Sequence, residues 1–297
     1  MGTYVVTGSY SGMGAAVVAR LRAAGHAVLT VDVREADVVA DLATADGRRA
    51  AIEEVLARCE GRLDGAVLAA GVGPARAPGR VPLICELNYL GVVTLLEALR
   101  PALAASGSAK VVVFASNSTT TTPLVPRRAV RALLAGDVPR AAAACRRYGA
   151  KAAPPMAYAA SKIALSRWVR RRAVTPAWAG AGIRLNAIAP GAVLTPLLEA
   201  QLATPAEARL IRSFPVPVGG FGDAGQLADW VVFMLSPAAD FLCGSIVFVD
   251  GGSDAWFRPD EWPAPVPGRR LVSYVRRMRE FSRAPRRPDA PRRPTAG

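Results

Sequence analysis

Short apolar runs, each followed by a glycine-rich or charged stretch, recur along the first 250 residues of the chain. Such runs predict buried strands, and they lie at 4–6, 27–31, 38–40, 66–69, 110–114, 183–188 and 246–249. Segments with apolar residues at helical spacing lie between them, including 15–24, 44–59 and 83–99. Alternating strands and helices are typical of a parallel sheet covered on both faces. We therefore predict an α/β fold, a single doubly wound Rossmann-type domain with a mostly parallel seven-stranded sheet.

A glycine-rich turn follows the first predicted strand directly. Its glycines would let the backbone turn tightly and approach a pyrophosphate at the N-terminus of the next helix. The spacing Gly-x-x-x-Gly-x-Gly differs from the commoner Gly-x-Gly-x-x-Gly, so the strand and helix on either side carry much of the signal. The candidate phosphate-binding residues are Gly8, Ser9, Ser11, Gly12, Met13 and Gly14.

Asp32 ends the second predicted strand, where a carboxylate can accept hydrogen bonds from the adenosine ribose hydroxyls and repel a 2′-phosphate. We therefore expect NAD rather than NADP as the cofactor. Arg34 could soften this preference, or it could be a solvated surface charge. Further candidate contacts follow the third and fourth strands, where the cofactor would lie close to the backbone: Asp41, Leu42, Ala70 and Gly71.

Tyr158 and Lys162 are four residues apart, so in a helix they lie on one face. A free tyrosine titrates near pH ~10, and a neighbouring ammonium favours the phenolate. Such a pair can give a proton to a ketone oxygen or take one from an alcohol. The alternative is a surface pair without a role. Only 3 of the 37 basic residues are lysines, which favours a specific need for an ammonium at position 162.

Length and composition limit the class of protein. With 297 residues and 52% apolar content, the chain can form one large core. No apolar run reaches the ~18 residues that span a bilayer, and the N-terminus lacks the regions of a signal peptide. We expect a cytoplasmic location. The four cysteines have no disulfide or zinc spacing, and the single histidine has no catalytic partner, so no metal site is predicted.

The net charge of +14 is concentrated in two segments. Residues 117–157 carry seven basic residues and one acidic residue, and residues 268–297 carry ten and two. The rest of the chain is neutral, so no nucleic-acid partner is predicted. We divide the chain into a catalytic domain, 1–258, and a basic Pro/Arg-rich extension, 259–297. The extension contains an amphipathic helix at 269–281 that would dock on its own dimer, lie on anionic lipid or touch nucleic acid, in that order of preference.

The chain resembles the short-chain dehydrogenase/reductase family over residues 3–257. The resemblance rests on the glycine turn, Asn88, Ser116, the Tyr158/Lys162 pair and Pro190-Gly191, which follow one another in that family's order. Within the family it is similar to the 3α-hydroxysteroid dehydrogenase/carbonyl reductase subgroup, on segments 41–48, 87–91 and 184–192 and on a helical insertion at 117–157, predicted as helices 127–134 and 139–148. It departs from the family at 68–69, where Leu-Ala replaces the usual Asn-Asn.

The resemblance implies a role for each catalytic residue. Tyr158 would be the general acid/base, and Lys162 would lower its pKa and hold the nicotinamide ribose. Ser116 would orient the substrate oxygen, and Asn88 would position a water that connects Lys162 to solvent. NAD would supply the hydride. The loop over the nicotinamide would contain Pro190, Gly191, Val193 and Thr195.

The segment 194–222 is apolar and rich in proline, as expected for a substrate lid. It favours a large apolar alcohol or ketone such as a hydroxysteroid, although its side chains could instead pack inward. The alternatives are a dehydrogenase for terpene or aromatic alcohols and a non-catalytic NAD-sensing scaffold. The family implies a homodimer or tetramer, commonly paired through the helix of the catalytic tyrosine. The insertion should obstruct that pairing and redirect it to another face.

Overall fold

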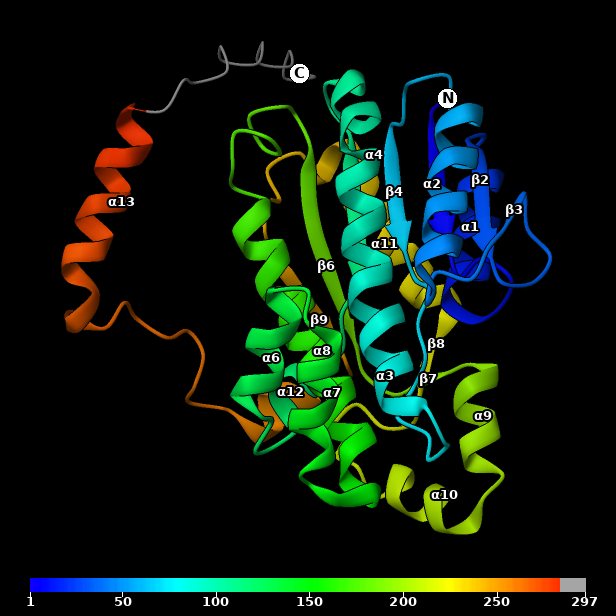
Figure 1. Cartoon of the computed structure of the whole chain (residues 1–297), viewed down its shortest axis with the longest axis vertical. Helices are drawn as coiled ribbons and strands as arrows, with labels where there is room; N and C mark the ends of the chain where they lie inside the picture. Colours follow the sequence, from blue (N-terminus) through cyan, green and yellow to red (C-terminus); the bar gives the residue numbers. More distant parts are fainter. Residues whose placement is uncertain (284–297) are drawn as a thin grey trace.

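The computed structural model of the chain describes residues 1–283, except for the side chains at positions 197, 200, 201, 206, 207, 210, 282 and 283. Its centre is a seven-stranded sheet in the order β3-β2-β1-β4-β5-β6-β9 (Figure 1). Every neighbouring pair is parallel, so the predicted mostly parallel sheet is confirmed and is parallel throughout. The strands are β1 (Thr3–Thr7), β2 (Ala27–Asp32), β3 (Val38–Val39), β4 (Gly65–Leu68), β5 (Lys110–Phe114), β6 (Arg184–Pro190) and β9 (Ile246–Val249).

The strand order reverses between β1 and β4, the two central neighbours from different halves of the sheet. Their residues are almost entirely buried, because helices cover both faces and leave no solvent-facing side. In an open parallel sheet, ligands bind beyond the carboxyl ends of the strands at such a switch point. The strand order therefore predicts a ligand-binding crevice between the carboxyl ends of β1 and β4.

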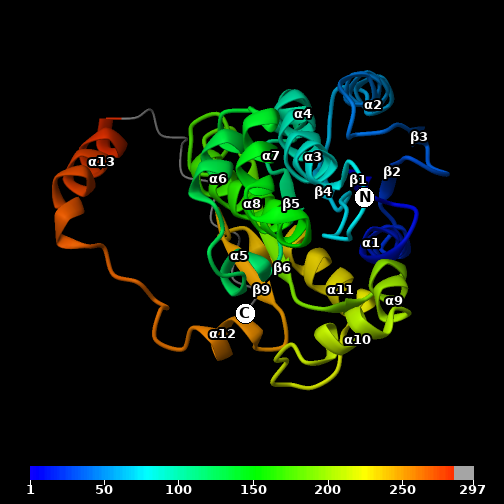
Figure 2. The same ribbon diagram turned by 60° about the horizontal axis from the view of Figure 1, so that its bottom comes forward.

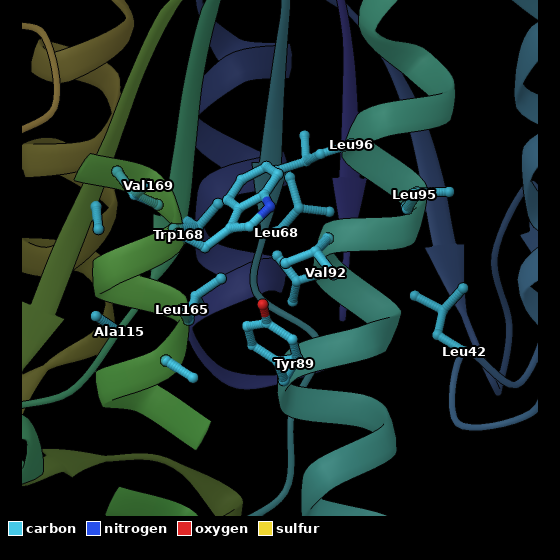
Figure 3. Close-up of a cluster of buried hydrophobic side chains, with 14 of the residues drawn as sticks. Leu42, Leu68, Tyr89, Val92, Leu95, Leu96, Ala115, Leu165, Trp168 and Val169 are labelled. Carbon is cyan, nitrogen blue, oxygen red and sulfur yellow. The ribbon is translucent and has the colours of Figure 1, made fainter. Parts of the chain in front are cut away.

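One face of the sheet is covered by α1 (Gly12–Ala23) and α11 (Ala224–Leu235), which pack against Val6 and Val112 in one apolar cluster. On the opposite face, α2 (Ala45–Arg58), α4 (Val92–Ser106) and α8 (Gly149–Arg172) form a larger cluster. Figure 3 shows its centre, where Leu96 of α4 lies beside Trp168 of α8. The two clusters confirm the expected helices on both faces.

The predicted helix at 83–99 is part of a longer one that runs from Arg80 to Ser106. It consists of α3 (Arg80–Cys85), a π-helical turn (Glu86–Gly91) and α4. By length and composition it could cross a membrane, but half of its apolar window is buried inside the protein. Its leucines at 95, 96, 99 and 103 are fully buried, so it is a core helix.

The insertion forms α5 (Ser118–Thr121), α6 (Arg127–Leu134) and α7 (Val138–Arg146). The bounds of α6 are as predicted, and α7 begins one residue early because Asp137 caps it by accepting a 2.9 Å hydrogen bond from the Arg140 amide. The catalytic helix α8 starts at Gly149, inside the segment assigned to the insertion, and contains Pro154 and Pro155. Apolar residues of α6 and α7 join the core beside α3 and α8, so the insertion is an integral part of the domain.

The remaining elements follow β6. A two-stranded parallel ribbon of β7 (Val193–Leu194) and β8 (Gly222–Asp223) encloses α9 (Pro196–Leu202) and α10 (Pro205–Arg212). Figure 1 shows these two helices at the end of the molecule opposite the N-terminus. Short 3-10 turns lie at Pro237–Ala239 and Gly268–Arg270. After α12 (Ser253–Phe257), the chain leads to α13 (Leu271–Arg283), which stands apart from the body in Figures 1 and 2.

Candidate active site

A cleft of about 310 Å³ lies beyond the carboxyl ends of β1, β2 and β4. It is lined by the glycine turn, the end of β2, the residues after β3 and β4, and the start of the 194–222 segment. Eleven of the predicted cofactor residues line it: Gly8, Ser11, Gly12, Met13, Gly14, Asp32, Asp41, Leu42, Ala70, Gly71 and Thr195. Segments far apart in sequence therefore meet at one crevice, as the strand order requires.

The glycine turn leaves no room for side chains. Gly8 has φ +68°, and a Cβ there would lie 2.6 Å from the Ala70 amide nitrogen. A Cβ on Gly14 would lie 2.0 Å from the Gly8 carbonyl oxygen, closer than any real contact. At Gly12 and Gly14 the first turn of α1 thus brings its backbone to the cleft, with amides that have no partner within the helix. This cradle suits the pyrophosphate of a dinucleotide.

Ser9 does not line the cleft, although it was a predicted phosphate-binding residue. Its side chain is buried, and its hydroxyl has no hydrogen-bond partner among the residues that the structure describes. A buried hydroxyl without a partner is costly. A dinucleotide bound against this turn is a suitable partner for it, so the turn fits the predicted cofactor.

Asp32 lies at the edge of the cleft, with its carboxylate held by two backbone amides. Oδ2 accepts a 3.1 Å hydrogen bond from the Tyr10 amide, and Oδ1 accepts one of 3.1 Å from the Arg34 amide. Each oxygen keeps further acceptor capacity for ribose hydroxyls. The Arg34 guanidinium lies 5.1 Å from the centre of the Tyr10 ring, an arrangement that anchors it at the rim.

Thr7 has a positioning role that the sequence analysis missed. It is fully buried at the end of β1, and its Oγ1 accepts a 3.2 Å hydrogen bond from the Ala70 amide. This bond joins the ends of β1 and β4 where the usual asparagines are replaced by Leu68 and Ala69. Leu68 is instead a core residue, 1% exposed. In the sequence, only the absence of the usual asparagines at 68–69 indicates that another group must bind the Ala70 amide.

Tyr158 on α8 and Ser116, two residues after β5, come together as predicted. Their side chains form a hydrogen bond, which lowers the pKa of the Tyr158 phenol, but burial has the larger effect and raises that pKa above its ordinary value. Ser116 is 7% exposed, and its Oγ accepts a 3.1 Å hydrogen bond from the Ser118 amide. The serine is thereby oriented toward the tyrosine.

Lys162 is one helical turn after Tyr158 and is 5% exposed. Its Nζ lies 5.8 Å from the centre of the Tyr158 ring and donates a 2.6 Å hydrogen bond to the Phe114 carbonyl. Burial lowers the pKa of Lys162 to about 8, so the side chain is still mainly protonated at neutral pH. The expected lowering of the Tyr158 pKa by this ammonium is not found: burial raises that pKa, and the opposing effect comes from the hydrogen bond with Ser116.

Asn88 is completely buried in the π-helical turn. Its Oδ1 accepts a 2.9 Å hydrogen bond from the Val72 amide, and its Nδ2 donates one of 2.9 Å to the Val72 carbonyl. A Cβ on Gly71 would lie 3.1 Å from Asn88 Oδ1 and 3.9 Å from Lys162 Nζ. The asparagine therefore braces the segment after β4 and lies close to the lysine.

Three predicted residues of the nicotinamide loop do not line the cleft. The Pro190 carbonyl accepts a 2.9 Å hydrogen bond from the Asn117 amide, and a Cβ on Gly191 would lie 2.7 Å from Asp250 Cα. Val193 is buried in the core cluster of α1 and α11. These residues shape the base of the loop. Thr195 reaches the cleft, with its Cγ2 3.4 Å from a Cβ built on Gly12.

Comparisons with known proteins agree on one group of enzymes. Residues 138–254 match a family model described as enoyl-(acyl carrier protein) reductase. A 3-alpha-hydroxysteroid dehydrogenase/carbonyl reductase from Comamonas testosteroni is 40% identical over 263 residues, 88% of this chain and 100% of the relative. A cis-4-hydroxycyclohexanecarboxylate dehydrogenase from Sinomonas cyclohexanicum is 30% identical over 84% of this chain and 96% of its own length.

The solved structures give the same picture. The crystal structure of a 3-alpha-hydroxysteroid dehydrogenase from Pseudomonas sp. B-0831 complexed with NADH has a TM-score of 0.81 and 41% sequence identity. The match covers 88% of this chain and 100% of that one. The uncovered share is close to the share of this chain that lies beyond residue 258.

Proposed function

This chain belongs to the short-chain dehydrogenase/reductase family, and from that premise we propose that it is an NAD-dependent oxidoreductase that interconverts a secondary alcohol and a ketone. The observation that carries the proposal is the hydrogen bond between the side chains of Tyr158 and Ser116, next to a cleft whose glycine turn fits a dinucleotide. NAD accepts the hydride when the alcohol is oxidised, and NADH donates it when the ketone is reduced. The protein supplies the proton transfer and the geometry.

The Tyr158 hydroxyl moves the proton at the substrate oxygen. In the alcohol-to-ketone direction the phenolate removes the hydroxyl proton, and in the reverse direction the phenol protonates the developing alkoxide. Ser116 donates a hydrogen bond to the same oxygen, which stabilises charge that develops there. The Ser118 amide holds the serine oxygen at 3.1 Å, so the donor is oriented before the substrate binds.

Lys162 provides a positive charge close to Tyr158 and can also carry a proton. Its pKa of about 8 lies close enough to neutral for it to pass a proton and regain one. Asn88 keeps the adjoining backbone in place through Val72. In this proposal Asn88 also positions a water that links Lys162 to solvent, using the lone pair that the Val72 amide leaves free.

We propose an alicyclic secondary alcohol as the substrate class. The names of the two relatives above both denote a hydroxyl on a saturated ring. The lid segment 194–222 is apolar, and its end is fixed to α12, because the rings of Phe214 and Phe257 lie 5.5 Å apart. A hydroxysteroid fits such a lid, and the alternatives are terpene and aromatic alcohols or carbonyls.

The test is a substrate panel with the purified protein. NAD is mixed with 3α-hydroxysteroids, substituted cyclohexanols, terpene alcohols and aryl alcohols, and the absorbance of NADH is followed. Turnover of ring alcohols above the others supports the proposal. A protein that binds NADH and oxidises none of them is the non-catalytic NAD-sensing scaffold instead, a function to which the intact Tyr158, Lys162 and Ser116 would contribute nothing.

Assembly and location belong to the same proposal. We infer a homo-oligomer, as the family resemblance implies. Because α6 and α7 cover part of helix α8, the subunits should pair through another face. The edge strand β9 has a neighbour in the sheet on one side only, the side of β6. A cytoplasmic location stays a prediction.

A further inference from the structure

The extension after residue 258 forms a helix whose apolar residues face away from the core. In α13, Leu271 is 62% exposed, Val275 is 37% exposed and Phe281 is 67% exposed. At 3.6 residues per turn, these residues lie on one side of the helix together with Tyr274 and Met278. Figures 1 and 2 both show α13 standing clear of the body. The domain therefore folds without burying Leu271 and Val275.

Half of the other residues of the helix are arginines, although the exposed Val272 lies among them. Arg277 borders the apolar side on one edge, and Arg279 borders it on the other. Of the acidic residues, α13 contains only Glu280, which pairs with Arg276 at 3.5 Å on the polar side. Arginines at the borders of an apolar stripe are typical of helices that lie in a membrane surface, because their stems reach down beside the apolar side chains while the guanidiniums meet phosphates.

A second basic surface lies on the same side of the molecule. A groove of about 650 Å³ between α6 and α7 has a floor of alanines and is flanked by Arg128, Arg131, Arg140 and Arg147, with Asp137 as its one acidic residue. Figures 1 and 2 place α13 on the side of the body that carries α6. A flat anionic surface could touch both. If α13 docked on such a groove instead, its arginines would lie close to the arginines of the groove, and the like charges would repel.

The segment that leads to α13 adds large aromatic side chains. Trp256 is 66% exposed and Trp262 is 73% exposed. Both side chains could also be buried in an interface with another protein. Tryptophans are enriched at the boundary between lipid headgroups and water. Between Trp262 and α13 the chain is rich in proline, which suits an extended spacer between the body and a surface.

The geometry points to peripheral binding of this protein to an anionic lipid bilayer, with α13 in the headgroup region and the arginine groove against the surface. Exposed apolar area, bordering arginines, flanking tryptophans and a second basic patch on the same side all fit that occupant. The inference does not rest on the proposed oxidoreductase function. Binding to a bilayer would, however, bring the enzyme close to apolar alcohols, because such substrates partition into lipid.

The experiment is co-sedimentation of the full-length protein with vesicles of phosphatidylcholine alone and with added phosphatidylglycerol. We expect binding to the anionic vesicles only, weakened by salt because the surface charges are screened. Val275→Glu and Ser273→Glu change the net charge equally, but only Val275 lies on the apolar side. Vesicle affinity should therefore fall about tenfold further in Val275→Glu, since a buried valine is lost.

Several outcomes would overturn the inference. One is no vesicle binding at low salt, and another is an equal loss in the two glutamate variants, which would mean adsorption by charge alone. A change of molecular mass in Val275→Glu by light scattering would show that α13 docks on a second copy. Binding to double-stranded DNA without binding to vesicles would identify a nucleic-acid surface. Val275→Leu, which keeps an apolar side chain, should bind as the wild type does, and NADH binding by each variant checks that the body is folded independently of turnover.

Discussion

The Nζ atom of Lys162 donates a 2.6 Å hydrogen bond to the carbonyl oxygen of Phe114, the last residue of β5. The bond connects helix α8 to the strand that ends just before Ser116. Because Tyr158 is on the same helix, the three side chains proposed to be catalytic are held in one frame. The position of the proton donor relative to the serine is therefore fixed by the fold before any substrate binds.

Replacing Tyr158 with phenylalanine should abolish turnover, because the hydroxyl that transfers the proton is removed while the ring still fills its place. We expect a loss of at least about a hundredfold in kcat, the usual contribution of a general acid or base. Binding of NADH, measured by fluorescence titration, should be nearly unchanged. Activity above a tenth of the wild-type value would remove Tyr158 from the mechanism.

Lys162 should make stability depend on pH in a defined window. Its pKa falls from 10.5 to about 8 on folding, so between these values the unfolded chain binds more protons and stability rises with pH; below about 8 the full penalty is present. We expect the wild type to gain about 2 kcal/mol relative to Lys162→Met between about pH 8 and about pH 9.5. Urea unfolding across that range measures it.

Lys151→Met is the matched control for this experiment, because Lys151 is exposed at the start of the same helix. An equal slope in all three proteins would mean that Lys162 keeps an ordinary pKa in the folded chain.

Asp32 should determine the preference for NAD over NADP. Asp32→Ala removes the acceptor for the ribose hydroxyls and the repulsion of a 2′-phosphate, and leaves Arg34 in place to attract that phosphate. We expect the ratio of kcat/KM for NAD to that for NADP to fall about tenfold, which corresponds to about 1.4 kcal/mol. Asp46→Ala, an exposed carboxylate paired with Arg49, should leave the ratio unchanged. A wild-type protein that prefers NADP would refute the assignment.

Thr7→Val should weaken both the fold and cofactor binding. Valine has the shape of threonine but leaves the partly buried Ala70 amide without its 3.2 Å hydrogen bond, a loss of about 1 kcal/mol in the free energy of unfolding. KM for NAD should rise, because Gly8 and Ala70 are packed against each other where both line the cleft. Thr7→Ser keeps the acceptor and should restore KM. If serine fails to restore it, the effect is one of packing.

The insertion should exclude the pairing of subunits through α8. We expect a dimer by light scattering, formed through another face such as that of β9. Deleting residues 259–297 should leave the dimer intact if α13 binds lipid as inferred above, whereas a monomer would place the extension in the interface. A crystal structure with two α8 helices packed on each other and α6–α7 clear of the contact would contradict the prediction.

Much of the fold was predictable because its signals are local. Buried parallel strands read as apolar runs, and all seven lie within two residues of their predicted bounds. The family resemblance located Tyr158, Ser116, Lys162 and Asn88, and the structure brings these four together. Helix α6 was predicted residue for residue, since its apolar positions have a clear helical period.

The missed features depend on contacts between distant segments. No local pattern tells that Thr7 binds Ala70, 63 residues away. The π-helical turn contains Asn88, whose two bonds to Val72 a helical period cannot reveal. The pKa of Tyr158 was predicted from the charge of its neighbour alone, whereas the depth of burial, known only from the packed structure, has the larger effect.

The π-helical turn gives the helix from Arg80 to Ser106 one extra residue within its length. If Glu86–Gly91 adopted regular α-helical bonding with all six residues kept, α3 would rotate by about 100° relative to α4. Ile84 and Cys85, both fully buried, would then leave the core beside α7 and α8. The wide turn around Asn88 therefore keeps α3 and α4 in register with their different neighbours, so that the packing of the insertion and the position of the proposed catalytic centre depend on the same six residues.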